Sequence, residues 1–217
     1  MEELNQALSV MPRIGDPAPN FKAMTTQGLI DFEEWRGDSW VILFSHPADF
    51  TPVCTTELSE FARNKEWFEE HNTKLIGLSI DSIHSHIAWV ANVKEKTGVY
   101  LDFPIIADLD MSVARMYGML HPGESSTSTV RAVFFIDPKG VIRLIMYYPL
   151  NVGRNMDEIM RVLEGMQISD KNGVALPINW RPGAKVIVPP PKTLNELNER
   201  ENMDGEKVDF YLIKKDI

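Results

Sequence analysis

The sequence is poor in cysteine, has fewer basic than acidic residues, and contains no long apolar run. Of its 217 residues only Cys54 is a cysteine, which excludes a framework of disulfides within the chain. The 22 lysines and arginines are outnumbered by 31 acidic residues, and the net charge of -9 disfavours a nucleic-acid partner. No stretch approaches the ~20 consecutive apolar residues of a membrane span.

No basic segment at the N-terminus leads into an apolar run, so we expect no targeting signal there. An unpaired thiol is typical of a reducing compartment. We therefore expect a cytoplasmic protein with no membrane partner. Its composition, 44% hydrophobic and 24% charged, is that of a globular chain with one core of medium size.

The chain then alternates between segments typical of strands and of helices. Trp40–Phe44 is a continuous apolar run, the pattern of a strand buried on both faces, and Lys74–Ile80 is a second strand candidate. Helix formers follow each run, from Pro52 to His71 and from His84 to Thr97. This order of strand, helix, strand and helix predicts parallel strands joined by right-handed crossovers.

Two further β-rich runs, Val130–Ile136 and Val141–Tyr148, are separated by four residues with the composition of a tight turn. A hairpin adds antiparallel strands, so the sheet is predicted to be mixed. A closing helix is expected over Met156–Met166. The predicted fold class is α/β, with a mixed central sheet flanked by helices in a domain of residues 1–167.

The composition changes beyond about Ile168. Pro177, Pro182 and the triplet Pro189–Pro191 cannot continue a central strand or a helix interior. We therefore predict an extended C-terminal arm over residues 168–217, with a short helix near Leu194–Arg200. Such an arm is expected to lack a core of its own and to pack on a partner subunit or across its own domain.

Cys54 lies between the first buried strand and the first helix, where open α/β sheets bind ligands. Thr51 followed by Pro52 predicts the helix start and makes Cys54 the third helical residue. Free N–H groups and the positive end of the helix dipole favour thiolate over thiol there, and thiolate is the form that peroxides oxidise. A lone cysteine is also often a small buried hydrophobe, and the helix start alone leaves both interpretations open.

The stretch PADFTPVC, from Pro47 to Cys54, resembles the PxxxTxxC motif of the peroxiredoxins. The longer SHPADFTPVCTTEL resembles their one-cysteine, peroxiredoxin-6-type branch. The resemblance extends over nearly the whole chain, arm included. It is carried further by GDSW at 37–40, DFPIIAD at 102–108, VRAVFFID at 130–137, VGRNMDEI at 152–159 and PGAKVIVPPP at 182–191.

This resemblance implies a thioredoxin-like fold and a thiol-dependent peroxidase of antioxidant defence. Cys54 would be the redox-active centre, which hydrogen peroxide or a small organic hydroperoxide converts to a sulfenic acid. No metal, haem or flavin cofactor is implied. The family also forms homodimers that can join into decameric rings.

The resemblance assigns roles to residues around the cysteine as well. Thr51 would hydrogen-bond the thiolate or the peroxide, and Pro47 would shield the sulfur from water. Arg131 would hold the thiolate and the substrate oxygen. An arginine in an apolar strand is costly to bury without an anionic partner, which a thiolate could provide. The alternative for Arg131 is a surface charge at the strand start.

Three more polar residues are candidates for the site. Arg154 resembles a second family arginine that supports the first. His46 could bind substrate and Glu57 could pair with an arginine, although each could equally be a loop or helix-surface group. The remaining histidines show no spacing typical of metal ligands and are expected to be solvated. They are His71, His84, His86 and His121.

Because the sequence holds no second cysteine, an external thiol must reduce oxidised Cys54. Two other functions stand beside the peroxidase. The first is an oligomeric holdase in which peroxide chemistry is secondary. The second is a phospholipase that uses Ser39 in the segment GDSWV, where Glu33 stands in place of the family's histidine. A serine without a nearby base is a weak nucleophile, which disfavours the phospholipase.

Overall fold

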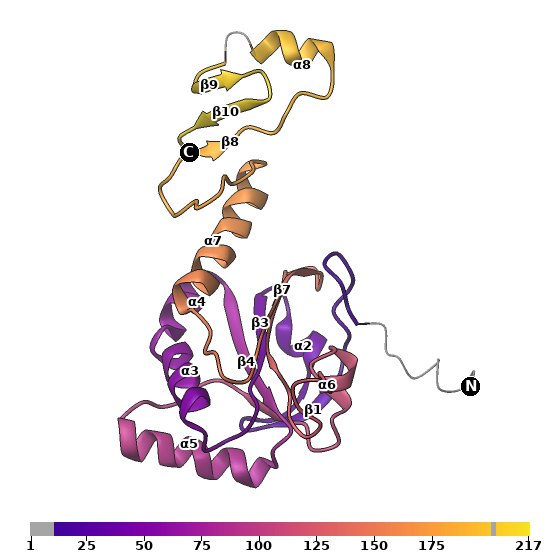
Figure 1. Cartoon of the computed structure of the whole chain (residues 1–217), viewed down its shortest axis with the longest axis vertical. Helices are drawn as coiled ribbons and strands as arrows, with labels where there is room; N and C mark the ends of the chain where they lie inside the picture. The colour runs from indigo at the N-terminus through magenta and orange to yellow at the C-terminus, as the bar shows by residue number, and fades with distance from the viewer. Residues whose placement is uncertain (1–10, 201–202) are drawn as a thin grey trace, which may run out of the picture. The chain divides into compact units, whose positions relative to one another are not determined.

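A computed structural model describes residues 11–200 and 203–217 (Figure 1). Residues 1–10, the start of the stretch in which we expect no targeting signal, lie outside this description. The chain divides into two compact units, one ending at Arg154 and one beginning at Asn155. Among the described residues, no helix is both long and apolar enough to cross a bilayer.

A seven-stranded sheet forms the centre of the first unit, in the order β2-β1-β5-β4-β3-β6-β7. The neighbours β3, β4 and β5 run parallel, and the other neighbours pair antiparallel. The predicted mixed sheet is therefore confirmed. The strands are β1 (Lys22–Thr25), β2 (Gly28–Asp31), β3 (Trp40–Ser45), β4 (Thr73–Ser79), β5 (Ile105–Ala107), β6 (Arg131–Ile136) and β7 (Ile142–Tyr148).

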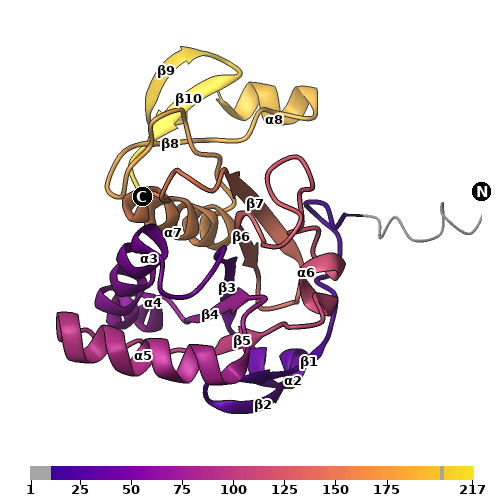
Figure 2. The same ribbon diagram turned by 60° about the horizontal axis from the view of Figure 1, so that its bottom comes forward.

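Helices cover both faces of this sheet. The connections from β3 to β4 and from β4 to β5 step in the same direction across the sheet, so right-handed crossovers put their helices on one face. Figures 1 and 2 show α3, α4 and α5 on that side and α6 on the other. The helices are α2 (Phe32–Arg36), α3 (Pro52–Arg63), α4 (Lys65–Glu70), α5 (Ile83–Thr97) and α6 (Ser112–Met116).

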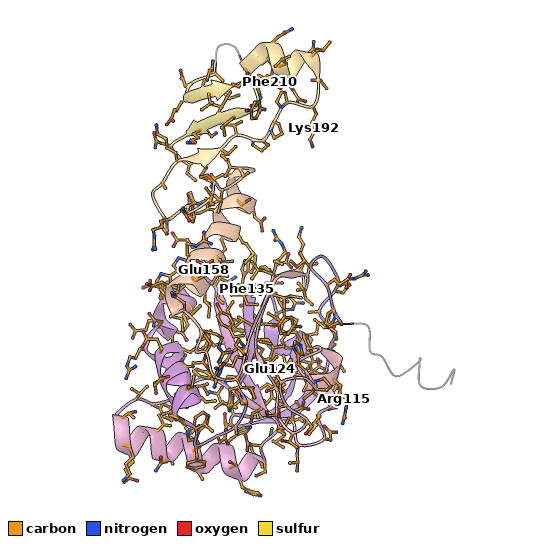
Figure 3. All side chains as sticks on the ribbon, in the orientation of Figure 1. Arg115, Glu124, Phe135, Glu158, Lys192 and Phe210 are labelled. Carbon is orange, nitrogen blue, oxygen red and sulfur yellow. The ribbon has the colours of Figure 1, made fainter. Side chains whose placement is uncertain are left out.

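The central strand β3 is buried along its whole length, as its apolar run predicts. Successive side chains of a strand point to opposite faces. Val41 and Leu43 accordingly join the core cluster on the side of α6. Phe44 faces α3, where its ring stacks on Phe61 with 4.0 Å between centroids. The sheet therefore has a core on both faces, and Phe135 of β6, labelled in Figure 3, is likewise fully buried.

The structure differs from the sequence prediction in several places within this unit, among them the short helices α2 and α6, which were not predicted. The helix expected over Pro52–His71 is interrupted at Asn64, whose side-chain amide bonds the carbonyl oxygen of Glu60 and so competes with the helical backbone. The hairpin of β1 and β2 and the three-residue strand β5 were not predicted. Each is too short to show a clear apolar period, and pairing within the sheet stabilises them.

In the second unit, residues 155–200 and 203–217 form two helices and a small sheet in the order β8-β10-β9. The predicted closing helix and the short helix near Leu194 are confirmed, although the former continues to Asn172, where Gly173 ends it at φ 61°. The elements are α7 (Met156–Asn172), β8 (Val186–Ile187), α8 (Leu194–Glu199), β9 (Glu206–Asp209) and β10 (Leu212–Lys215).

The expectation that the arm lacks a core of its own is wrong. Trp180 is 1% exposed and packs with Val174 and Val186 in a small apolar cluster, against Ile168 and Leu176. Its indole N–H donates to the carbonyl oxygen of Ala184 at 3.0 Å. A single tryptophan buries enough apolar surface to organise a short segment, which the proline-rich composition obscures.

Gly98 provides a test of the helix ends. It follows α5 at φ 73°, and its N–H donates to the carbonyl oxygen of Lys94. We expect Gly98→Ala to lower the free energy of unfolding in urea by about 1 kcal/mol, because a side chain is strained at positive φ.

The matched control is Gly123→Ala, since Gly123 is not among the positive-φ glycines and a Cβ there meets nothing within 4 Å. Its unfolding free energy should stay within about 0.5 kcal/mol of the wild type. Equal losses in the two variants would contradict the assigned role of Gly98.

Candidate active site

Cys54 lies in the first turn of α3, where the sequence predicts it. Thr51 occupies the N-cap position with extended backbone, at φ -107° and ψ 148°, and Pro52 begins the helix. The Thr51 hydroxyl caps no helical N–H; it donates instead to the carbonyl oxygen of Ala48 at 2.9 Å. Pro47 is half-buried in the same loop. The loop and the helix start together fix where the sulfur lies.

Cys54 is fully buried, with 0% of its surface exposed. The sulfur therefore has no contact with solvent in this structure. The surroundings are polar, however, which separates this cysteine from a small hydrophobe of the core. Arg131 Nη1 lies 3.2 Å from Cys54 Sγ.

Arg131, the first residue of β6, is only 3% exposed, so it is not the surface charge that the sequence left as an alternative. Its Nη1 also donates to Glu57 Oε2 at 2.7 Å. Its Nε and Nη2 donate to the carbonyl oxygen of Leu150 at 3.0 and 2.7 Å. These bonds hold the guanidinium in one orientation, with one nitrogen shared by the sulfur and the carboxylate.

Glu57, which contacts Arg131, also forms a bidentate ion pair with Arg154. Glu57 Oε1 accepts from Arg154 Nε at 2.9 Å and Oε2 accepts from Arg154 Nη2 at 2.7 Å. The remaining nitrogen, Nη1, donates to the carbonyl oxygens of Ser45 and Ala132. Both side chains are buried, at 1% and 4% exposed. Arg154 therefore ties the carboxylate to the ends of β3 and β6.

The cluster of Arg131, Glu57 and Arg154 carries a net positive charge. Burial alone would raise the pKa of Glu57, but the charge and hydrogen bonds of Arg154, with a contribution from Arg131, outweigh it and lower that pKa. Two guanidiniums then face one carboxylate. The sulfur of Cys54 lies beside this excess positive charge, 3.2 Å from Arg131 Nη1.

His46 directly follows β3 and is fully buried. Its Nε2 lies 3.0 Å from Asp49 Oδ1, whereas its buried Nδ1 has no hydrogen-bond partner among the described residues. Burial lowers the pKa of His46, so the ring is neutral at neutral pH. The structure thus places His46 in the loop that leads to Cys54.

The expectation that His86 is solvated is wrong. His86 is 0% exposed, with Nδ1 2.8 Å from Asp49 Oδ2 and Nε2 3.1 Å from the carbonyl oxygen of Ile106. His84 is exposed as expected, and His71 and His121 are half-buried. Asp49 is the polar residue that sequence reasoning missed. It lies inside the PADFTPVC stretch, but its partner on α5 is 37 residues away, so no local spacing reveals the pair.

The structure does not bring a base to Ser39. The Ser39 hydroxyl donates to Asn72 Oδ1 at 3.1 Å, and Glu33 lies exposed on α2 with its backbone N–H bonded to Asn20. No hydrogen bond joins Ser39 to Glu33 among the described residues. The serine therefore lacks the activation that hydrolysis requires.

Comparison with known proteins identifies the family. The AhpC/TSA family matches residues 14–145, and the C-terminal domain of 1-Cys peroxiredoxin matches residues 165–202. A peroxiredoxin of Aquifex aeolicus is 51% identical over 217 residues, which cover 95% of this chain and 98% of the relative. Peroxiredoxin 2 of Caldanaerobacter subterraneus is 54% identical over 209 residues, covering 95% and 94%.

Solved structures agree with these matches. A yeast mitochondrial 1-Cys peroxiredoxin superposes with a TM-score of 0.87 at 46% identity, covering 95% of this chain and 100% of the other. A mutant of the peroxiredoxin 6 of Arenicola marina gives 0.85 at 39% identity, covering 94% and 97%. The fold is thus thioredoxin-like, with a small C-terminal sheet, and the site is that of a thiol enzyme. The chain belongs to the peroxiredoxin family.

Removal of the Glu57 charge tests the electrostatics of the cluster. Glu57→Gln removes the carboxylate that both buried guanidiniums contact, so we expect the free energy of unfolding at neutral pH to fall by about 3–5 kcal/mol. Glu60→Gln, on the exposed side of the same helix, should cost less than about 1 kcal/mol. Equal costs in denaturant titrations would contradict the analysis.

The stability of the wild type and that of Glu57→Gln should also depend differently on pH. The folded-state pKa of Glu57 lies below its ordinary value of 4.5. Its stabilising contribution is therefore complete above about pH 4.5 and is lost as the pH falls through the lower, folded-state pKa. The difference in unfolding free energy between the wild type and Glu57→Gln should thus narrow as the pH falls below about 4.5. A constant difference over that range would be inconsistent with an ionised Glu57.

Proposed function

We propose that the protein is a thiol-dependent peroxidase of antioxidant defence, which reduces hydrogen peroxide and small organic hydroperoxides through Cys54. As a peroxiredoxin it is an oxidoreductase. The observation that carries the assignment of Cys54 is the 3.2 Å contact of its sulfur with Arg131 Nη1, in a buried cluster of two guanidiniums and one carboxylate.

The chemistry follows from this contact. The Cys54 thiolate attacks one peroxide oxygen along the O–O axis, so that an S–O bond forms as the O–O bond breaks. The sulfur is oxidised to sulfenic acid, and the second oxygen leaves as hydroxide or alkoxide and takes a proton from water. The N–H groups of Arg131 stabilise the negative charge as it moves from sulfur to the leaving oxygen.

Thr51 and Pro47 would complete the substrate site. Because the Thr51 hydroxyl already donates to Ala48, its lone pairs are left to accept a hydrogen bond from the peroxide O–H. Pro47, half-buried in the same loop, would limit the access of water to the sulfur. Arg154 and Glu57 would act indirectly, by holding Arg131 in place.

Reduction of the sulfenic acid needs an external thiol, since Cys54 is the only cysteine. A first thiol condenses with the sulfenic acid to a mixed disulfide and releases water, and a second thiol exchanges with that disulfide to restore Cys54. The yeast mitochondrial relative is described as resolved by glutathione and thioredoxin systems. We infer a reductant of one of these two kinds.

The assembly and the cell compartment are part of this proposal. We infer a homodimer that assembles into a decameric ring, with residues 168–217 as the oligomerisation segment, in the cytoplasm. Large apolar side chains on the surface of the second unit support subunit contacts there. They are Ile178, Leu194, Phe210 and Tyr211. The comparisons do not favour an oligomeric holdase as the main function.

Limited peroxide should consume the Cys54 thiol stoichiometrically and give a sulfenic acid that dimedone traps, as mass spectrometry would show. Cys54→Ser should abolish peroxide turnover while the protein remains folded. A wild-type thiol that stays titratable after excess peroxide would rule out the peroxidase.

Loss of the Arg131 guanidinium should slow the reaction of Cys54 with peroxide more than loss of a surface arginine does. We expect Arg131→Met to lower kcat/KM for hydrogen peroxide by about 10²–10³ and to slow alkylation of Cys54 by iodoacetamide. Arg63→Gln, on the exposed face of α3, is the control and should stay within about twofold of the wild type. Equal effects of the two substitutions would remove Arg131 from the mechanism.

A further inference from the structure

The contacts between β3 and β6 change in kind where the two strands reach the site. Figure 2 shows the strands side by side, and their antiparallel ladder of paired residues ends at Phe44 and Val133. The strand β3 continues to Ser45, and β6 begins two residues before Val133, at Arg131. Side-chain hydrogen bonds join the two strands in this last stretch, beside the arginine cluster.

The Ser45 hydroxyl bonds two backbone groups of this stretch. It donates to the carbonyl oxygen of Val130 at 2.5 Å and accepts from the N–H of Ala132 at 3.1 Å. Ser45 and Ala132 are 0% exposed and Val130 is 2% exposed. Backbone groups buried to this degree need hydrogen-bond partners, and a single hydroxyl serves both.

The two backbone groups belong to the peptide units on either side of Arg131. Because peptide units are planar, the φ and ψ angles of Arg131 alone relate one unit to the other. A hydroxyl bonded to both units therefore restricts both angles, and with them the direction in which the side chain leaves the strand. The guanidinium is at the far end of a long side chain, so a small backbone rotation displaces it considerably.

The opposite edge of β6 is held by β7. The ladder between these strands includes the pair Arg131 and Tyr148, and the N–H of Val130 donates to the carbonyl oxygen of Met119 at 3.0 Å. Ser45 provides the matching contact from the side of β3. The backbone of Arg131 is thus fixed from both neighbouring strands.

Ser45 also contacts the second arginine of the site. Its carbonyl oxygen accepts from Arg154 Nη1 at 2.9 Å, and the same nitrogen donates to the carbonyl oxygen of Ala132 at 3.0 Å. One residue therefore bonds the peptide units of Arg131 through its hydroxyl and the guanidinium of Arg154 through its carbonyl. Both guanidiniums in turn contact Glu57.

We propose that Ser45 is a positioning residue, whose hydroxyl holds Arg131 so that Nη1 lies against the sulfur of Cys54. This role rests on the proposed peroxidase function. The hydroxyl gives its one hydrogen to Val130, so Ser45 acts through Arg131 and not as a donor to the substrate. A misplacement of about 1 Å in a site can cost about 10²-fold in rate, which makes the mounting of the guanidinium matter.

Removal of the hydroxyl tests this role. In Ser45→Ala the peptide units beside Arg131 lose their shared partner, and we expect kcat/KM for hydrogen peroxide to fall about tenfold because the guanidinium is less well placed. Ser59→Ala is the matched control. Ser59 is also a buried serine, 3% exposed, but its hydroxyl has no hydrogen-bond partner among the described residues. Its loss should leave kcat/KM within about twofold of the wild type.

A double variant separates positioning from general damage. Once Arg131→Met has removed the guanidinium, Ser45→Ala has nothing further to displace, so kcat/KM should stay within about twofold of Arg131→Met alone. A general loosening would lower the activity again and would speed alkylation of the buried Cys54 by iodoacetamide. We expect alkylation in Ser45→Ala to be slower than in the wild type, because the cation lies less close to the sulfur.

Nitrogen NMR reports the guanidinium itself. The Nε–H resonance of Arg131, assigned by its loss in Arg131→Met, should shift in Ser45→Ala. That of Arg36 should not shift, since this buried arginine donates to the carbonyl oxygen of Pro138 and has no contact with Ser45. Shifts of both resonances would indicate a general change of structure and contradict the proposed role.

Three activity results would also overturn the proposal: an unchanged kcat/KM in folded Ser45→Ala, an equal loss in Ser59→Ala, or a further tenfold loss in the double variant. Should Ser45→Ala fail to fold, hydrogen exchange of the wild type decides. The N–H of Ala132 should exchange far more slowly than a free amide, and exchange at the free rate would remove the hydrogen bond on which the role depends. Wild-type protein that does not consume peroxide would instead contradict the proposed function, which keeps the two failures distinct.

Discussion

Two buried guanidiniums, Arg131 and Arg154, share a single carboxylate, Glu57, and the site depends on this imbalance. A buried cation without a counter-ion is strongly unfavourable, so the cluster needs one more negative charge. Cys54 Sγ lies 3.2 Å from Arg131, so in the proposed mechanism a thiolate there would supply that charge. The interaction that favours an ionised nucleophile therefore also compensates a buried cation of the core.

The fold brings these charges together from distant parts of the chain. The helix α3 supplies both Cys54 and Glu57, one turn apart, and β6 supplies Arg131. Backbone carbonyls at the ends of β3 and β6 fix Arg154. Since β3 and β6 are paired neighbours, the antiparallel register of the sheet sets the distance between the two arginines. In the loop before α3, Asp49 is bound by His46 of the same loop and by His86 of α5.

Much of the fold and the position of Cys54 could be predicted from the sequence, because both depend on local sequence patterns. The apolar run of β3 and the Thr51–Pro52 helix start place Cys54 without any knowledge of the rest of the chain. Short or non-local features were missed. The strand β5 has three residues, and Asp49 and His86 meet across 37 residues, so neither produces a periodic signal. The core around Trp180 was hidden because proline-rich composition dominates its segment.

The central claim, that the resting sulfur is ionised inside the arginine cluster, can be measured directly. The ultraviolet difference spectrum between reduced wild type and Cys54→Ser reports the thiolate alone. We predict a thiolate absorption band at neutral pH that disappears on acidification and is weaker in Arg131→Met. A difference spectrum without that band at neutral pH would show a neutral thiol beside Arg131 and contradict the charge balance on which the site depends.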